Sequence, residues 1–277
     1  MEKPRSSTQH HILRRLLFTA GFLSVLTGTG SHAAPPVQIS IGDALRIGKK
    51  VWQNESNGSV AGLTAWNSGE DFASLGIGHF IWYPEGMRGP FEESFPKFIA
   101  FARGHDATMP TWLAQASACP WKSRSEFSKA QNSSQMRDLR QFLASTFDLQ
   151  AQFLVQRLQE SLAKMVDDAA PDQRDKVERQ FTRVASTPHG CYALVDYVNF
   201  KGEGVLHTER YNGQGWGLLQ VLEQMHGTEA GAAATREFAN SAAAILRRRV
   251  QNSPPLRHEA RWLPGWLNRV RTYNQTS

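Results

Sequence analysis

The sequence predicts an α+β fold that is mostly helical and contains a small antiparallel β-hairpin or sheet. Residues 62–83 form short apolar runs separated by Gly-, Ser- and Asn-rich turns, a pattern typical of strands joined by tight turns. From about residue 91 onward, apolar residues recur at spacings of three and four, which indicates amphipathic helices. We therefore expect a single domain at 34–277, with a β lobe at about 60–85 and a helical lobe at about 91–275.

The first 33 residues have the pattern of a secretory signal peptide. Four basic residues precede an apolar run at 16–26, which is too short to span a membrane. Ser31 and Ala33 supply the small residues that a signal peptidase reads, so we expect cleavage after Ala33, with Ala34 as the alternative. The mature protein would be periplasmic or secreted and would have no transmembrane segment, whereas an uncleaved signal would act as an anchor.

The net charge gives no strong indication of a partner. The signal segment contributes +3 of the formal net charge of +6, so the mature chain is only mildly basic. This gives no reason to expect nucleic-acid binding, although it is compatible with an anionic cell-wall polymer. No spacing of His, Cys, Asp or Glu matches a metal site, and we expect a monomer that needs no metal or organic cofactor.

Cys119 and Cys191 are the two cysteines of the chain. In an oxidising compartment an even pair favours a disulfide. It would close a loop of about 72 residues and would stabilise the fold by about 4 kcal/mol on the chain-entropy account. Two unpaired buried thiols are the alternative, and we expect the disulfide.

Residues 40–56 are predicted to form the first helix. Ser40 is a capping residue with Asp43 three positions on, and an Asn-Gly pair at 57–58 ends the helix. Glu55 therefore lies in the last turn, where the negative end of the helix dipole opposes its charged form. A carboxyl group that keeps its proton is what general acid catalysis requires.

The stretch at 52–83 combines carboxylates with aromatic residues. Glu70 and Asp71 lie in its central turn, Glu55 precedes that turn, and Glu85 follows it. A carboxylic acid in an apolar wall, beside rings that stack on sugars, is typical of a glycosidase site. Acids on solvated turns are the ordinary alternative. The tryptophans that bracket these acids are Trp52, Trp66 and Trp82.

This stretch resembles the active-site hairpin of phage-type lysozymes (muramidases). Those enzymes have a glutamate at the end of the first helix, a Leu-x-x-aromatic strand, a turn with an aspartate, and then Thr-Ile-Gly-x-Gly-His. Here Leu-Thr-Ala-Trp at 63–66 is followed by a turn and by Ser-Leu-Gly-Ile-Gly-His at 74–79. Ser74 falls on the family's threonine, and Glu55 falls on its catalytic glutamate when about four extra residues precede Leu63.

The resemblance implies a lysozyme-like fold and a set of site residues. Glu55 would be the acid, and Ser74 would help to hold water on the far face of the sugar. The family's aspartate position falls on Ser68, so Glu70 or Asp71 would have to replace that carboxylate. The residues expected to contact substrate are Trp66, Asn67, His79, Asn199 and Glu203.

Three of these residues also have an ordinary structural interpretation. His79 could hold the hairpin through a backbone hydrogen bond, and Asn199 could cap or bridge the end of its helix. Glu203 could be an exposed turn residue, because it lies between two glycines. The sequence leaves these alternatives open.

The second half of the chain resembles the same family in the same order. Ala-Leu-Val-Asp-Tyr-Val-Asn-Phe-Lys-Gly-Glu-Gly at 193–204 is similar to the family's Ala-Leu-x-x-Phe-x-x-Asn-x-Gly-x-Gly. Arg-Trp-Leu-Pro-Gly-Trp-Leu-Asn-Arg-Val at 261–270 resembles its closing helix. Residues 105–134 have no counterpart in that pattern.

A second comparison involves Gly-Trp-Gly-Leu-Leu-Gln at 215–220. It is similar to the Gly-Leu-Met-Gln that follows the catalytic glutamate of lytic transglycosylases. In this chain Glu203 and Glu209 precede the string far more closely than Glu55 does. The alternative is a helix that opens with glycines for close packing.

These observations lead us to expect an exported glycosidase that cleaves β-1,4 bonds of peptidoglycan, with Glu55 as general acid and Glu70 or Asp71 as base or stabilising charge. A lytic transglycosylase or chitosanase-like enzyme is an alternative, because a single-acid mechanism needs no second carboxylate. A third interpretation is a non-catalytic protein that binds wall glycan or an envelope partner. An ion pair between Glu55 and Arg46 or Lys49 would favour binding.

Overall fold

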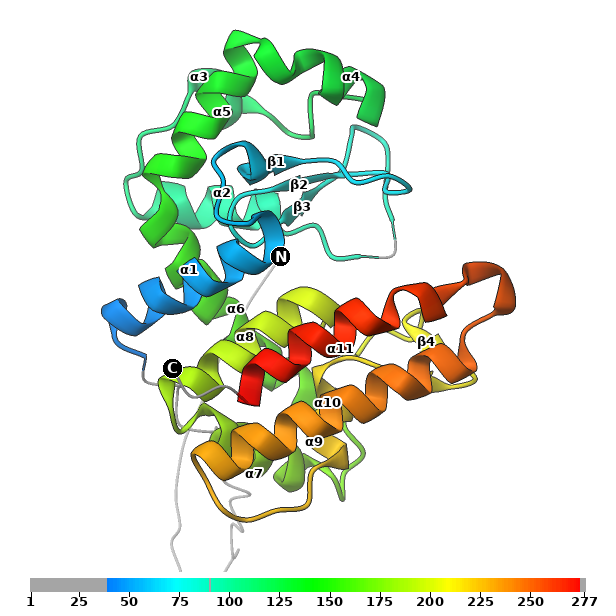
Figure 1. Cartoon of the computed structure of the whole chain (residues 1–277). Coiled ribbons are helices and arrows are strands. Elements are labelled where there is room, and N and C mark those ends of the chain that lie inside the picture. Colours follow the sequence, from blue (N-terminus) through cyan, green and yellow to red (C-terminus); the bar gives the residue numbers. More distant parts are fainter. Residues whose placement is uncertain (1–38, 90, 275–277) are drawn as a thin grey trace, which may run out of the picture. The chain divides into compact units, whose positions relative to one another are not determined.

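The computed structural model describes residues 39–89 and 91–274, all within the second of the chain's two units, Pro35–Ser277. The predicted signal peptide at 1–33 lies outside the described residues. The fold is α+β and mostly helical, with a small antiparallel three-stranded sheet (Figure 1), which confirms the predicted fold class. Among the described helices, none has both the length and the apolar character that a bilayer crossing requires.

Helices make up most of the described chain. The α-helices are α1 (Ile41–Ser56), α2 (Phe95–Gly104), α3 (Thr111–Gln115), α4 (Arg124–Lys129), α5 (Ser134–Ser145), α6 (Phe147–Asp168), α7 (Arg174–Ala185), α8 (Pro188–Lys201), α9 (Leu218–Gln224), α10 (Ala232–Asn252) and α11 (Leu263–Arg271). The short 3-10 helices are η1 (Ala61–Leu63), η2 (Ala130–Asn132), η3 (Pro255–Arg257), η4 (Glu259–Arg261) and η5 (Thr272–Asn274).

The three-stranded sheet lies within the predicted hairpin region. Strands β1 (Thr64–Ala65), β2 (Ala73–Leu75) and β3 (Phe80–Trp82) pair antiparallel in sequence order. In the register, Ser74 is opposite both Ala65 and Ile81. The strands are short because each ends in a turn that contains glycine or asparagine.

The turn between β2 and β3 is fixed to helix α6. Gly76 has φ 74°, and a Cβ there would lie 2.3 Å from Oε1 of Gln150, so only glycine fits. The same oxygen of Gln150 accepts a hydrogen bond from the Ile77 amide at 2.8 Å. Gln150 is fully buried, so the hairpin is held rigidly at the start of α6.

Helix α8 is buried on all sides, since every residue from 190 to 198 is buried. It packs against α1, α6, α7, α9 and α10. Helix α1 packs against both α6 and α8 and also contacts η1, which leads into β1. The last turn of α1 therefore lies where the hairpin and the helices meet (Figure 1).

Two helix starts depend on local capping. Residues 171–173 form a turn, and α7 begins after it at Arg174. The polar segment at 117–134 contains α4, whose start is capped by the Ser123 hydroxyl accepting from the Glu126 amide at 3.2 Å.

A second, two-stranded sheet was not predicted. Strands β4 (Arg210–Tyr211) and β5 (Gln214–Gly215) pair antiparallel through Asn212 and Gly213, which have φ 51° and 75°. Asn-Gly is the strongest short hairpin signal in a sequence, so this element could have been found.

The predicted disulfide is not present. Cys119 and Cys191 are both buried free thiols. Cys119 lies beside the end of β3, where its amide donates to the Tyr83 carbonyl at 3.0 Å, while Cys191 lies in the first turns of α8 with Sγ 3.1 Å from the Ala185 carbonyl oxygen. An even number of cysteines in an oxidising compartment favours a disulfide, but it does not show whether the two positions are neighbours in the fold.

We expect thiol titration of the denatured protein to find two reactive groups, and the native protein to react slowly. Burial raises the pKa of Cys119 to about 12 and that of Cys191 to about 11, so little thiolate forms at neutral pH. Titration with and without guanidinium, in the absence of reductant, measures both states. Finding no thiol in the denatured protein would show that the two cysteines are paired in a disulfide after all.

Candidate functional site

Glu55 lies in the last turn of α1, as the capping pattern predicted. The Ser40 hydroxyl accepts a hydrogen bond from the Asp43 amide at 3.1 Å and starts the helix. Asn57 ends it in the left-handed conformation, with φ 52° and ψ 28°. The Glu55 side chain is 15% exposed, so it is largely buried and still accessible.

Three segments distant in sequence converge on the Glu55 carboxylate. Asn199, near the end of α8, donates from Nδ2 to Oε1 at 3.2 Å. Arg269 of α11 donates from Nη2 to the same oxygen at 2.6 Å. His79 of the hairpin places Nδ1 3.4 Å from Oε2. The structure therefore brings together three residues that the sequence singled out, Glu55, His79 and Asn199.

His79 connects Glu55 to the hairpin through its second nitrogen. Nε2 lies 3.3 Å from the carbonyl oxygen of Gly62. Because a carbonyl only accepts, this contact assigns a proton to Nε2. Nδ1 is the nitrogen that faces Glu55, so the imidazole joins the last turn of α1 to the backbone that leads into β1. The contact with Gly62 is the backbone hydrogen bond that the sequence offered as the structural interpretation of His79.

A fully buried aspartate organises the helical side of the site. Asp196 of α8 accepts from Arg269 Nε at 2.8 Å and Nη2 at 2.9 Å, which is a two-pronged contact. It also accepts from Asn54 Nδ2 at 2.9 Å and from the Tyr273 hydroxyl at 2.6 Å. Four donors thus satisfy one buried carboxylate, and they come from α1, α11 and the C-terminal 3-10 helix η5.

Arg269 is a permanent cation in this arrangement. Burial alone would lower the pKa of its guanidinium, but the charges of Asp196 and Glu55 outweigh burial and raise that pKa well above the usual value. The guanidinium also lies 4.4 Å from the ring centre of Phe200. Since Nη2 contacts both carboxylates, the buried aspartate fixes the nitrogen that holds Glu55.

A row of alternating cations and aromatic rings continues from Phe200. Lys201 Nζ lies 4.0 Å from the Phe200 ring centre and 3.5 Å from that of Trp266, and burial lowers the pKa of Lys201 well below its usual value. The Arg249 guanidinium lies 4.0 Å from the ring centre of Trp216. Trp216 and Trp266 therefore serve mainly in packing, because their faces are covered by the Arg249 guanidinium and the Lys201 amino group of the protein itself.

A second cluster lies on the hairpin around Glu70. Asn67 Nδ2 donates to Glu70 Oε2 at 3.0 Å, and the Ser74 hydroxyl donates to the same oxygen at 3.4 Å. The Trp66 indole donates to the Glu70 carbonyl oxygen at 2.7 Å and its ring packs 5.7 Å from that of Phe127. Four of the predicted residues are thus grouped, although Trp66 is buried and presents little ring surface to a sugar.

The remaining predicted residues lie outside these clusters. Asp71 is exposed on the hairpin turn. Glu203 accepts from the Ser161 hydroxyl at 2.8 Å and pairs with Lys164 at 2.9 Å, both on α6. Glu209 is half-buried, and burial raises its pKa to about 7. Within the described residues, the hydrogen-bond and ion-pair partners of the Glu55 side chain are Asn199, Arg269 and His79, and none of these three acids is among them.

The Gly-Trp-Gly-Leu-Leu-Gln segment at 215–220 lets two stretches of backbone pack closely, which is the alternative to a transglycosylase-like motif. A Cβ on Gly217 would lie 2.2 Å from the amide nitrogen of Gly204, so the two backbones touch. Gln220 completes the start of α9 by accepting from the Gly217 amide at 3.0 Å. This contact explains the string without a catalytic role.

Sequence reasoning missed Arg269, Asp196 and Asn54 as site residues. Asp196 offered a signal, because it is the one charged residue in the apolar run at 191–198. No sequence signal pointed to Arg269, because its partners Glu55 and Asp196 lie 214 and 73 residues away in the chain. Across residues 39–89 and 91–274, no group of three or more His, Cys, Asp and Glu side chains is placed to hold a metal ion.

Arg269→Leu should destabilise the protein by about 3–5 kcal/mol, because Asp196 would remain buried without its counter-charge. Arg46→Leu is the matched control: it removes a pair with Asp43 in which the arginine side chain is 73% exposed, and should cost at most about 1 kcal/mol. Equilibrium unfolding in guanidinium measures both free energies. Equal losses for the two variants would contradict the structural role of the network.

Comparison of the chain with known protein families, with curated proteins and with solved structures finds no match. The likeness to phage-type lysozymes therefore depends on the quoted motifs alone, and function has to be argued from the geometry around Glu55.

Proposed function

We propose that the protein is an exported, lysozyme-like glycosidase that cleaves β-1,4 bonds of peptidoglycan with Glu55 as general acid. The convergence of His79, Asn199 and Arg269 on this one carboxyl group carries the proposal. Glu55 is also the residue that falls on the acid of the lysozyme pattern. Two independent lines, one from motif order and one from contacts, therefore support the same side chain.

The contacts suggest how the acid would work. Asn199 and Arg269 occupy Oε1, which leaves Oε2 as the oxygen that exchanges a proton with His79 and with substrate. Glu55 donates this proton to the leaving glycosidic oxygen as the bond to the sugar carbon breaks. Arg269 then stabilises the carboxylate that remains.

The Glu70 cluster supplies the second half of a hydrolytic site. Ser74 and Asn67 both contact Oε2 of Glu70, so Oε1 is left to accept a proton from water. Glu70 acts as base and the Ser74 hydroxyl orients that water, which is the role the lysozyme resemblance gave to this position. Asp71, one residue on and exposed, adds negative charge near the developing cation.

If Glu70 does not take part, the proposed enzyme would use a mechanism with Glu55 as its single acid. The acetamido group of the sugar would then attack in place of water, as in lytic transglycosylases, or the enzyme would resemble chitosanases. Product analysis separates these reactions, because hydrolysis leaves reducing ends and transglycosylation leaves anhydro ends.

Binding of wall glycan or an envelope partner without turnover is the second candidate. The observation that favours it is the 2.6 Å ion pair between Glu55 and Arg269, together with Ser68 at the family's aspartate position. This ion pair differs from the one with Arg46 or Lys49 that the sequence considered, because Arg269 lies among the other site residues.

Glu55→Gln should lower the rate of peptidoglycan cleavage by at least ~10²-fold while the fold survives, in line with the usual contribution of general acid catalysis. The amide keeps an oxygen for Asn199 and Arg269 but has no proton to transfer. Release of reducing and anhydro ends from purified peptidoglycan measures the rate, and thermal unfolding checks the fold.

Controls for this variant come from the other carboxylates. Glu70→Gln or Asp71→Asn should cost less than Glu55→Gln, and Glu203→Gln should leave cleavage unchanged, because Glu203 bonds to α6. Full activity of Glu55→Gln would move the site elsewhere, with Glu203 next. A wild-type protein that cleaves no wall glycan over a broad pH range would favour the binding function.

A further inference from the structure

The connection between α10 and α11 carries the most exposed large apolar side chain among the residues that the structure describes. Leu256, in η3, is 91% exposed, and Trp262, which follows η4, is 44% exposed. Figure 1 shows α10 and α11 side by side, with their connection at the right-hand edge of the view. Single exposed apolar residues are ordinary on protein surfaces, so a binding surface has to be argued from what surrounds these two.

A buried ion pair holds this connection in place. Glu259, in η4, is 2% exposed and accepts from Arg249 at both of its oxygens, each at 2.8 Å. The Tyr211 hydroxyl donates to the same carboxylate at 2.8 Å. Three donor atoms from α10 and β4 thus fix the chain three residues after Leu256, so the leucine is presented on an anchored turn.

The outward face of the connection is positively charged. Arg257 and Arg261 are exposed, whereas Glu259, the one carboxylate within 253–262, is buried against Arg249. The Arg261 guanidinium lies 4.6 Å from the ring centre of Trp262, so cation and indole belong to one surface. Because the carboxylate is turned inward, the connection presents cationic and apolar side chains together to the solvent.

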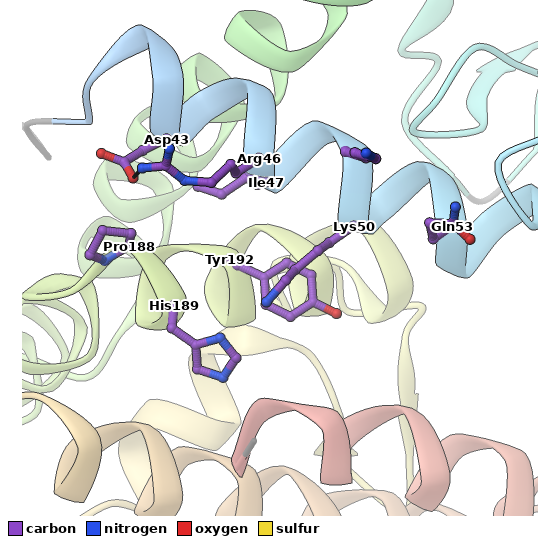
Figure 2. A pocket seen from close by; sticks show the side chains of 9 residues that line it. Asp43, Arg46, Ile47, Lys50, Gln53, Pro188, His189 and Tyr192 are labelled. Atoms are coloured by element: carbon purple, nitrogen blue, oxygen red, sulfur yellow. Dashed lines mark hydrogen bonds and ion pairs between the residues drawn. The ribbon is translucent and has the colours of Figure 1, made fainter. Parts of the chain in front are cut away.

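Basic residues on α1 have a different relation to the apolar residues beside them. Figure 2 shows Arg46 and Lys50 next to Ile47 and Tyr192, which are only 2% and 4% exposed. Lys50 lies over the Tyr192 ring, with Nζ 5.0 Å from its centre. Long basic side chains often cover apolar surface in this way. At the α10–α11 connection, in contrast, the apolar side chains themselves reach the solvent.

We propose that the α10–α11 connection docks on an anionic lipid surface. Leu256 enters the acyl region, and Trp262 lies at the level of the headgroups, where indole rings are favoured. Arg257 and Arg261 contact lipid phosphates, and each arginine near an anionic surface should strengthen binding about fivefold. The binding is reversible, because one leucine and one indole insert far less apolar surface than a spanning helix does.

Two other occupants fit this surface less well. An anionic polysaccharide would contact the two arginines but would leave Leu256 in water. A second copy of the chain would bring the same positive charges, so a symmetric contact would be repulsive. The lipid proposal does not depend on the glycosidase proposal, because Glu55 and the residues that contact it lie outside 253–262.

Sedimentation with vesicles tests this surface, using protein purified after export so that the expected signal at 1–33 has been removed. Vesicles of equal parts phosphatidylglycerol and phosphatidylcholine should bind the protein at least ~10-fold more strongly than vesicles of phosphatidylcholine alone, and salt should weaken this binding. Arg257→Glu with Arg261→Glu should lower the partition coefficient at least ~25-fold. Lys122→Glu with Lys129→Glu makes the same charge change at exposed positions near and in α4, and should retain most of the binding.

A fluorescent label at position 256 distinguishes insertion from electrostatic contact. Leu256→Cys adds one exposed thiol to a chain whose two native cysteines are buried, so an environment-sensitive dye can be attached there in the native protein. Its emission should shift to the blue with anionic vesicles. Leu256→Ser should weaken binding about tenfold or more, because the inserted hydrocarbon is lost. Glu55→Gln should bind vesicles as the wild type does, which separates this surface from cleavage.

The proposal would be overturned by absent or equal binding to anionic and neutral vesicles, by unchanged binding of Leu256→Ser or of the double arginine variant, or by sedimentation with vesicles while the label at 256 keeps its emission. Self-association that Leu256→Ser abolishes would assign the surface to a second copy of the chain instead. Binding to isolated peptidoglycan that only the double arginine variant loses would assign it to a wall polymer.

Discussion

The ion pair between Asp196 and Arg269 is the interaction on which the candidate site depends. Asp196 is fully buried in α8, and a buried carboxylate without a counter-charge would be strongly unfavourable. Its two contacts with Arg269 therefore determine where α11 lies against α8. Asn54 and Tyr273 complete the set, so the end of α1 and the C-terminal turn are fixed by the same carboxylate.

The orientation of Glu55 follows from this pair. Arg269 Nη2 contacts Asp196 and Glu55 together, so a structural ion pair positions the candidate carboxyl group. Asp196 is unsuited to be a second catalytic carboxylate, because it is 0% exposed and both of its oxygens are occupied. At the other oxygen of Glu55, His79 Nδ1 lies 3.4 Å from Oε2. The proposed acid therefore has a cation on one oxygen, which stabilises its charged form, and an imidazole nitrogen beside the other.

Local sequence signals predicted the local structure well. Ser40 and the Asn-Gly pair at 57–58 gave the bounds of α1, and the glycines of the hairpin marked the turn that α6 holds. These features depend on backbone preferences within a few residues, which a sequence displays directly. The Asn-Gly turn of the second sheet belonged to the same class of signal and was overlooked.

Contacts between residues far apart in the chain were much harder to predict from the sequence. The partner of Glu55 on α11 could not be read from spacing, and Cys119 and Cys191 do not pair although their number favoured it. Such contacts depend on how whole helices pack, and a single sequence carries that information only through residues that break a pattern. Asp196, a charge within a buried apolar helix, is the clearest example.

A crystal structure of the Glu55→Gln protein with a bound peptidoglycan oligosaccharide tests the central claim most directly. The account predicts a glycosidic oxygen within about 3 Å of the substituted side chain at position 55, with Arg269 still contacting both that side chain and Asp196. An oligosaccharide bound away from position 55, or bound with every glycosidic oxygen out of its reach, would contradict the assignment of Glu55 as the acid.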